Sequence, residues 1–377
     1  MNKVRLPAIL GCLGCIAVLS CTPERSAPPR DASGSDVEVP ASIARDCSRP
    51  VETEIVAFLE TVPDGSRVLF PEGGCYSQHR TIVVADRHGL DIDGGGSTFR
   101  MDAPSGSAGN NANWRVAGGS RITLRNMLVR GAYDPLPRGT PGSGGSTDHG
   151  ISLWGATETT VVDVEVSNPD GECVTADSDV RKGTDYRLNP ISRNITIDRL
   201  RCLHAGRQGV AATAVEGFTL SNSFIDDAQQ NGVDIEIDVP GQIARDITIT
   251  DNTFGGIYFS AVAVPLGDSP DVGNVTIKSN RMVNAPDTCY PAIYIGDNRF
   301  RMRDIRITDN VLLTQGDGVR LIHVDSGEVA RNTITKVNPE NTACHNPDFN
   351  PAANVGIRLF DSSVRAEGNV LHGLPAG

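Results

Sequence analysis

The chain has 377 residues, of which 39% are hydrophobic, 5% aromatic and 21% charged, with 40 Gly and 23 Pro. This apolar content excludes a disordered chain, and so much Gly and Pro excludes a coiled coil. Lys and Arg number 34 against 46 Asp and Glu, and the net charge of −12 disfavours nucleic acid as a partner.

Residues 1–20 have the pattern of a lipoprotein signal peptide. Two basic residues precede an apolar run from Leu6 to Leu19, which is short for a transmembrane span. The sequence Val-Leu-Ser-Cys21 resembles the lipobox of bacterial lipoproteins, which implies that Cys21 is acylated and anchors the protein to a membrane. Thr22, rather than Asp, after this Cys implies an outer-membrane or cell-surface location. The alternative is ordinary cleavage nearby, with Cys21 incidental.

Residues 21–46 are polar, are rich in Pro and Ser and have no apolar period. They are predicted to form the lipid anchor and a tether. Residues 47–377 are then a single folded domain.

Six of the nine cysteines follow Cys21. An even number in an exported chain favours disulfides over metal binding, because no Cys-x-x-Cys or nearby His pair exists. Six cysteines allow about fifteen pairings. We predict the bonds Cys47–Cys75, Cys173–Cys202 and Cys289–Cys344.

A short phrase of alternating apolar and polar residues recurs and ends at an Asn. The gaps between these Asn residues are 30, 28, 30, 22 and 37, and each phrase is followed by two further short strands. Three strands in each unit of roughly 22 residues plus loops are typical of one coil of a solenoid. Stacked in one turn, the Asn side chains are predicted to form a ladder that satisfies backbone groups. The recurring residues are Asn222, Asn252, Asn280, Asn310, Asn332 and Asn369.

With these repeats, residues 50–377 resemble the right-handed parallel β-helix superfamily, the fold of pectate lyases, polygalacturonases and chondroitinase B. The resemblance implies an all-β solenoid of about ten coils. Pro50 to Val62 reads as an amphipathic helix that caps its N-terminal end, and Ser66 to Phe70 as the entry strand.

In this superfamily, the strands that open with Gly form the first sheet, which carries the substrate. Alternation along Gly232-Val-Asp-Ile-Glu236 turns Asp234 and Glu236 outward. The same alternation predicts a column of an aromatic residue, carboxylates and guanidinium groups, which suits a polysaccharide. The alternative is a solvated acidic face. The column contains Trp154, Asp177, Asp234, Glu236, Tyr294, Arg320 and Arg358.

The leading hypothesis is a polysaccharide lyase. A calcium ion held by Asp177, Asp234 and Glu236 would acidify a uronate C5 proton, because clustered acids repel one another or bind a cation. The proposed base is Arg207. Lys182 and Arg320 are the alternatives for this base.

Two other functions stay open. Asp234 and Glu236, about 7 Å apart on one strand, would suit an inverting glycoside hydrolase. A non-catalytic surface protein would bind glycan or a partner through the same face.

Three further residues are weaker candidates. Asn168-Pro-Asp170-Gly resembles the catalytic Asn-Thr-Asp-Gly segment of polygalacturonases, which implies a role for Asp170 as an acid, although this is also a good turn sequence. His149 and His204 lie near strand starts, where a structural hydrogen bond is the simpler role.

The insertions 134–149 and 177–189 are predicted to wall the site. Loops this long in a regular solenoid are usually binding edges or mobile tips.

Overall fold

The computed structural model shows short parallel strands at regular intervals along the chain. Ser33–Gly377 form one compact unit. The structure describes residues 34–103, 111–134, 148–183, 185–237, 241–264, 271–285, 288–296, 300–337 and 354–375. The signal peptide and Cys21 lie outside the described residues, so the signal peptide and the acylation stay predictions.

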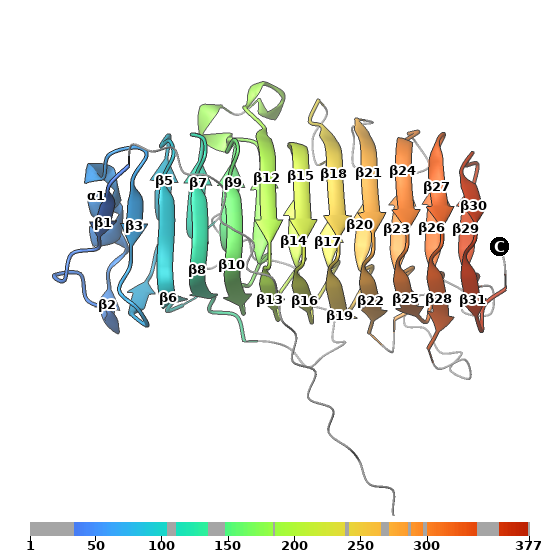
Figure 1. Ribbon diagram of the computed structural model, residues 1–377, viewed down its shortest axis with the longest axis horizontal. Coiled ribbons are helices and arrows are strands. Elements are labelled where there is room, and N and C mark those ends of the chain that lie inside the picture. The colour runs from blue at the N-terminus through green and yellow to red at the C-terminus, as the bar shows by residue number, and fades with distance from the viewer. Residues whose placement is uncertain are drawn as a thin grey trace, which may run out of the picture. The chain divides into compact units, whose positions relative to one another are not determined.

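Figure 1 shows the coils of this unit side by side along one axis, from α1 to β31. One sheet has ten strands, which agrees with the predicted number of about ten coils. Every strand pairs in parallel with the same strand of the next coil, and the parallel β-helix predicted from the repeats is therefore confirmed. The ten strands are β5 (Ile82–Ala85), β7 (Ala112–Ala117), β9 (His149–Trp154), β11 (Val174–Asp177), β14 (Val210–Ala212), β17 (Val233–Asp234), β20 (Val262–Val264), β23 (Ile293–Gly296), β26 (Val319–Ile322) and β29 (Ile357–Phe360).

A second sheet of 21 strands covers the rest of each coil. It has two rows, joined through the long strands β6, β8 and β10, which pair with both rows. The first row is β1 (Asp36–Glu38), β3 (Arg67–Leu69), β6 (Asp91–Met101), β8 (Thr123–Arg130), β10 (Thr160–Ser167), β12 (Ser192–Asp198), β15 (Val215–Ser221), β18 (Ala244–Thr250), β21 (Val272–Lys278), β24 (Arg303–Thr308), β27 (Gly327–Ala330) and β30 (Arg365–Glu367). The second row adds β2 (Asp46–Pro50), β4 (Cys75–Gln78), β13 (Arg201–Leu203), β16 (Phe224–Asp226), β19 (Thr253–Ile257), β22 (Arg281–Asn284), β25 (Val311–Thr314), β28 (Thr333–Lys336) and β31 (Val370–His372).

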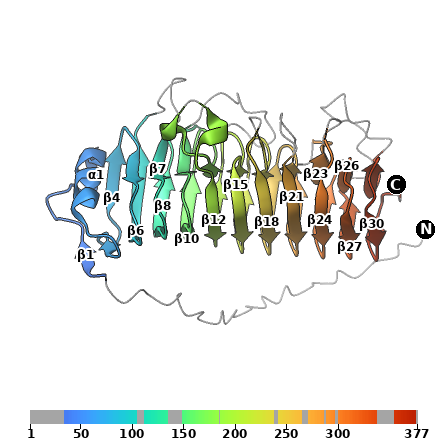
Figure 2. The ribbon, with the colours of Figure 1, turned by 90° about the horizontal axis from the view of Figure 1, so that it is seen from above.

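The helix α1 (Glu52–Thr61) lies at the N-terminal end of the solenoid (Figure 2). Ile55 and Leu59 are buried against the core and lie on one face at i, i+4 spacing. The predicted capping helix and the entry strand, which is β3, are therefore confirmed. No helix among the described residues is long and apolar enough to cross a membrane.

The folded unit begins before Cys47, so the predicted tether 21–46 is too long. Strand β1 pairs with β3 in parallel, and Val39 and Ile43 are each 5% exposed within the core. The apolar residues of this segment are few but are spaced so that they reach the end of the first coils. A prediction from composition alone does not detect strand pairing between such short segments.

The Asn ladder is confirmed at five of its six predicted positions. The backbone N–H of each ladder residue donates to the side-chain oxygen of the next, at 3.0 Å from Asn252 to Asn280 and 2.9 Å from Asn280 to Asn310. The prediction for Asn222 is wrong. This residue is exposed in a left-handed turn at φ +50°, and Ser223 occupies the ladder position instead. Asn332 and Asn369 complete the ladder.

Two predicted disulfides are confirmed, Cys47–Cys75 and Cys173–Cys202. Cys289 is also disulfide-bonded, while its predicted partner Cys344 lies outside the described residues. Disulfides persist in oxidising compartments, so these bonds indicate an exported protein.

We predict that Asn280→Ala lowers the free energy of unfolding by about 1–3 kcal/mol, because it leaves buried backbone groups without partners. The Asn280 amide donates to the Ile249 carbonyl at 2.9 Å and accepts from Asn252. Asn222→Gly, at an exposed left-handed position, is the control and should change stability by less than about 0.5 kcal/mol. Denaturant unfolding measures both, and equal losses in the two variants would contradict the ladder's role.

Candidate functional site

The outward residues of the ten-stranded sheet stack as the alternation predicted. Asp177 pairs with Trp154 across neighbouring strands. Asp234 pairs with Ala211 on one side and Ala263 on the other. The row continues through Tyr294, Arg320 and Arg358. Trp154 and Asp177 lie two residues along the strands from the row of Asp234, because Asp234 is aligned with Thr175 through Ala211. The predicted residues therefore share the outward face but form two rows and not one column, and their roles stay predictions.

Trp154 is almost buried, with 8% of its surface exposed. The guanidinium of Arg115, on the preceding strand β7, lies over its ring at 3.6 Å from the centroid. Burial lowers the pKa of Arg115 to about 10. Arg115 was not predicted from the sequence, although it occupies an outward position next to the tryptophan coil. One face of the expected aromatic platform is thus covered by a cation.

Asp234 lies in a closed polar environment and is 3% exposed. Its Oδ2 accepts from Gln208 Nε2 at 3.0 Å and from Asn231 Nδ2 at 3.1 Å. Its Oδ1 is buried and has no hydrogen-bond partner among the described residues. Burial raises the pKa of Asp234 to about 6, against the two amide hydrogen bonds that lower it. Near pH 6 this carboxyl is therefore protonated in about half of the molecules.

Glu172 is the second carboxyl of this region and was not predicted from the sequence. It is 2% exposed; Arg207 Nη1 lies 3.2 Å from its Oε1, and His149 Nδ1 contacts its Oε2. Burial raises the pKa of Glu172, but the His149 imidazole and the Arg207 guanidinium outweigh burial, and the net pKa is below the usual value. Glu172 is therefore ionised at neutral pH.

Register explains why these side chains meet. Ile151, Val174, Val210 and Val233 pair in sequence across four strands. The residues two positions before them therefore stack at the strand starts: His149, Glu172, Gln208 and Asn231. Together with Arg207 and Asp234 they are called the polar cluster here. Spacing from the repeated Val could have identified Glu172, because it occupies the same place as His149.

Asp177 is the last residue of β11, whereas Glu236 lies two residues beyond the end of β17, so Glu236 does not share a strand with Asp234 as predicted. Burial raises the pKa of Asp177, whose Oδ1 accepts from the Ser178 N–H at 2.5 Å. Glu236 is half-buried.

The predicted calcium ligands do not form a donor set. Among the described residues, no three His, Cys, Asp or Glu side chains come together in a way that could hold a metal ion. Two amide N–H groups donate to Asp234 Oδ2. These donors stabilise the carboxyl oxygen but leave it poorly placed to bind a cation. The calcium site stays a prediction.

Arg320 and Arg358 meet at the buried carboxylate of Asp317. Arg320 Nε donates to Asp317 Oδ2 at 2.8 Å, and Arg358 donates to both oxygens at 2.7 and 3.1 Å. The Asp317 hydrogen bonds raise the pKa of Arg358. The two guanidinium groups are held by a buried carboxylate that was not singled out from the sequence. Tyr294, half-buried, precedes them in the column.

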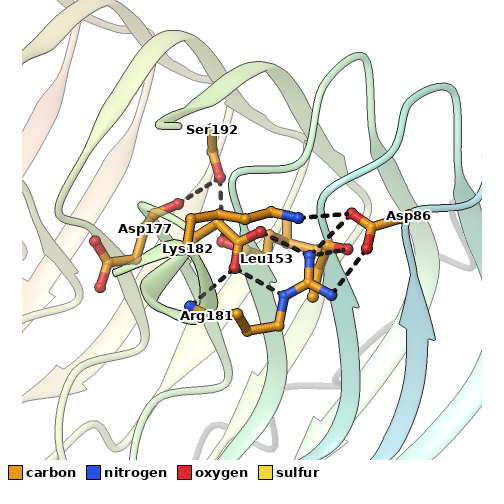
Figure 3. Close-up of polar contacts among 8 residues, drawn as sticks. Asp86, Leu153, Asp177, Arg181, Lys182 and Ser192 are labelled. Atoms are coloured by element: carbon orange, nitrogen blue, oxygen red, sulfur yellow. Dashed lines mark hydrogen bonds and ion pairs between the residues drawn. The ribbon is translucent and has the colours of Figure 1, made fainter. Parts of the chain in front are cut away.

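The segment after Asp177 is fixed to an earlier coil (Figure 3). It contains the 3₁₀ turns Val180–Lys182 and Tyr186–Leu188. Arg181 donates to Asp179 at 2.6 Å, to Asp86 at 3.1 Å and to the Ala117 carbonyl at 2.8 Å. Lys182, one alternative base, lies 3.5 Å from Asp86. The described part of the predicted wall 177–189 is therefore anchored by ion pairs, and 135–147 of the other insertion lies outside the described residues.

The weaker candidates occupy the turns that lead into the sheet. Asp170 is half-buried in its turn. His204 Nδ1 lies 2.9 Å from Asp227 Oδ2, the structural hydrogen bond expected of it. His149, in contrast, contacts Glu172 within the polar cluster.

Comparison with known proteins agrees with this fold. Residues 149–334 match the family model described as the right handed beta helix region. No curated protein sequence matches the chain.

Solved structures resemble the chain over most of its length. The DFA-IIIase from Arthrobacter chlorophenolicus A6 without its lid is 12% identical, with a TM-score of 0.63 over 90% of this chain and 89% of that one. The endo-xylogalacturonan hydrolase from Aspergillus tubingensis is 13% identical, with a TM-score of 0.59 over 89% and 95%. PfbA, a surface adhesin of Streptococcus pneumoniae, is 14% identical, with a TM-score of 0.54 over 91% and 92%. At these identities the likeness shows the fold and not the activity.

We predict that Asp234→Asn removes a pH-dependent loss of stability. The folded-state pKa of about 6 lies above the ordinary value of 3.8, so the folded protein holds this proton more tightly than the unfolded chain. The stability from Asp234 is complete below pH 4 and is lost as pH rises through 6, a change of at most about 3 kcal/mol. Urea unfolding of both proteins from pH 4 to 7.5 measures the difference. A wild type that gains stability over the variant as pH rises would contradict the raised pKa.

Proposed function

We propose that this right-handed parallel β-helix protein hydrolyses a polysaccharide, because one polar cluster holds a carboxyl with a raised pKa, Asp234, and one with a lowered pKa, Glu172. Asp234 is the general acid, and Glu172 is the carboxylate that activates water. The observation that carries the proposal is the buried Asp234 Oδ1, which has no partner among the described residues, in the same polar cluster as Glu172, whose pKa is lowered.

The acid step follows from how Asp234 is held. Gln208 and Asn231 fix Oδ2, so the proton on the carboxyl belongs on Oδ1. From there it passes to the glycosidic oxygen as the bond from this oxygen to the anomeric carbon breaks. A pKa of about 6 allows a carboxyl to donate a proton at mildly acidic pH, which an ordinary Asp could not do.

The base step uses Glu172. Water attacks the anomeric carbon from the other side, and the Glu172 carboxylate takes its proton. Arg207 and His149 keep this carboxylate charged and fix its position. The coils of Glu172 and Asp234 are separated by one coil, so they lie roughly 10 Å apart along the axis. Retaining enzymes separate their carboxyls by about 5 Å and inverting ones by about 6.5–9.5 Å. The axial separation alone is twice the retaining value and just above the inverting range, so of the two outcomes inversion is favoured.

This pair differs from the one expected from the sequence. Asp234 and Glu236 were paired because they were predicted to share one strand, whereas Glu172 contacts Arg207 and His149 at the strand starts. The lyase hypothesis proposed Arg207 as the base, with Lys182 and Arg320 as alternatives, but the Arg207 guanidinium is the cation of an ion pair with Glu172. The structural similarity to an endo-xylogalacturonan hydrolase supports hydrolysis of a polysaccharide.

Substitution tests the assignment. Asp234→Asn and Glu172→Gln should each reduce turnover at least about 100-fold, because each removes one proton-transfer group. Glu165→Gln, in an ion pair with Arg201 on the other sheet, should leave turnover unchanged. New reducing ends are measured on a panel of neutral and uronate polysaccharides, alongside ultraviolet absorbance of unsaturated uronates.

The panel separates the alternatives. New reducing ends without ultraviolet absorbance support hydrolysis. A rise in absorbance would instead support the lyase hypothesis. The similarity to PfbA, a surface adhesin, keeps a binding protein as the second candidate. Binding of a polysaccharide without turnover by the wild type would favour it.

The pH profile gives an independent prediction. The acid Asp234 must be protonated, so kcat/KM should fall about tenfold per pH unit above about 6. On the acidic side it should fall only where Glu172 becomes protonated, below the usual range of a Glu because its pKa is lowered. Initial rates from pH 3.5 to 8.5 measure both limbs. An activity that rises from pH 6 to 8 would contradict Asp234 as the acid.

A further inference from the structure

Three aromatic side chains gather in the turns that lead into β20 and β23. The Phe259 ring lies 4.6 Å from that of Tyr290 and 5.3 Å from that of Tyr258, between ring centroids. All three residues are half-buried and are therefore not part of the closed core. They belong to turns and do not take part in the aromatic core around Phe99 and Trp114.

Register places these rings on the same side as the proposed acid. Val210, Val233, Val262 and Ile293 pair in sequence across four strands. The residues three positions earlier therefore occupy equivalent places in four successive turns, and they are Arg207, Gln230, Phe259 and Tyr290. The Phe259 N–H donates to the Gln230 carbonyl at 3.0 Å, which fixes the stacking. Phe259 and Tyr290 thus lie one and two coils beyond the coil of Asp234.

A buried polar atom accompanies the rings. Asn284, 2% exposed, donates its Nδ2 to the Phe259 carbonyl at 3.0 Å and to the Tyr290 carbonyl at 3.3 Å. Its Oδ1 is buried and has no hydrogen-bond partner among the described residues. A buried acceptor without a donor is costly unless a ligand supplies the donor. A sugar hydroxyl is such a donor, and an aromatic ring suits the apolar face of a sugar.

Charge decides which kind of sugar fits. In the described parts of turns 226–231, 255–260 and 284–290 there is no Lys or Arg. The charged residues in the described parts of these turns are Asp226 and Asp227, and both are acidic, so these parts supply no cation for a carboxylate. The cation of this row is Arg207, one turn before that of Asp234, and Glu172 is its partner.

We infer that Tyr258, Phe259, Tyr290 and Asn284 form a subsite for a neutral sugar residue of the polysaccharide. It lies on the C-terminal side of Asp234. The inference rests on the proposed function only for its position relative to the cleaved bond. The substrate therefore carries a neutral residue next to the bond that is broken, and a polymer made of uronate alone is not the substrate.

Binding and cleavage are measured separately to test this subsite. The inactive Asp234→Asn protein is applied to an array of neutral, mixed and uronate oligosaccharides, with and without the further substitutions Phe259→Ala and Tyr290→Ala. Each aromatic substitution should weaken binding about tenfold, through lost ring contact. Phe224→Ala, a half-buried aromatic on β16 of the other sheet, is the matched control and should have no effect. Phe259→Leu and Tyr290→Phe retain bulk and serve if an Ala variant does not fold.

The outcomes separate the two proposals. Preferential binding of neutral or mixed oligosaccharides, lost on Phe259→Ala and Tyr290→Ala, supports the subsite. Binding of uronate oligomers alone, binding unaffected by the aromatic variants, or no binding to any member of the array would overturn it. If the aromatic variants bind normally while the wild type hydrolyses polysaccharide, only the subsite fails. If the aromatic variants lose binding and the wild type never hydrolyses its ligands, only the proposed function fails.

Discussion

Parallel pairing of each coil with the next is the constraint from which the rest of the structure follows. Each strand pairs with the equivalent strand of the neighbouring coil, so a residue type at one position is brought against the same position about 4.8 Å away. Asn252 and Asn280 are 28 residues apart in sequence but share a hydrogen bond at 3.0 Å. Residues at equivalent positions of successive coils are thus stacked on one another. The result is a ladder where these residues are amides and a cluster where they are charged.

The ladder and the polar cluster are two outcomes of the same stacking. In the ladder, every buried amide finds donors and acceptors in the neighbouring coils, which stabilises the turn. In the polar cluster, Arg207 and His149 form ion pairs with Glu172, whereas Asp234 keeps one buried oxygen without a hydrogen-bond partner among the described residues. Burial of such a group is unfavourable for the fold, and its pKa is shifted in the direction that a general acid requires. The unfavourable burial therefore lies at the residue that we propose as the general acid.

The sequence predicted what depends on repetition and missed what depends on the offset between coils. Alternation and spacing were enough for the solenoid, the capping helix, two disulfides and the outward position of Asp234. Glu172 was missed because outward positions were read only within strands, and it lies two residues before its paired Val. Asn222 was placed in the ladder because the phrase before Ser223 ends one residue early, and only hydrogen bonds distinguish the two. The sequence of a single strand does not indicate that Arg115 covers the Trp154 ring, because the two residues lie on neighbouring strands.

The central claim is that Asp234 is protonated and Glu172 is ionised at the same pH. Carbon-13 NMR of the carboxyl groups, titrated from pH 3 to 8 and assigned with Asp234→Asn and Glu172→Gln, measures both directly. We predict a midpoint near pH 6 for Asp234 and one below the usual range for Glu172. A midpoint near 4 for Asp234, or a Glu172 that is still protonated at pH 6, would contradict this claim.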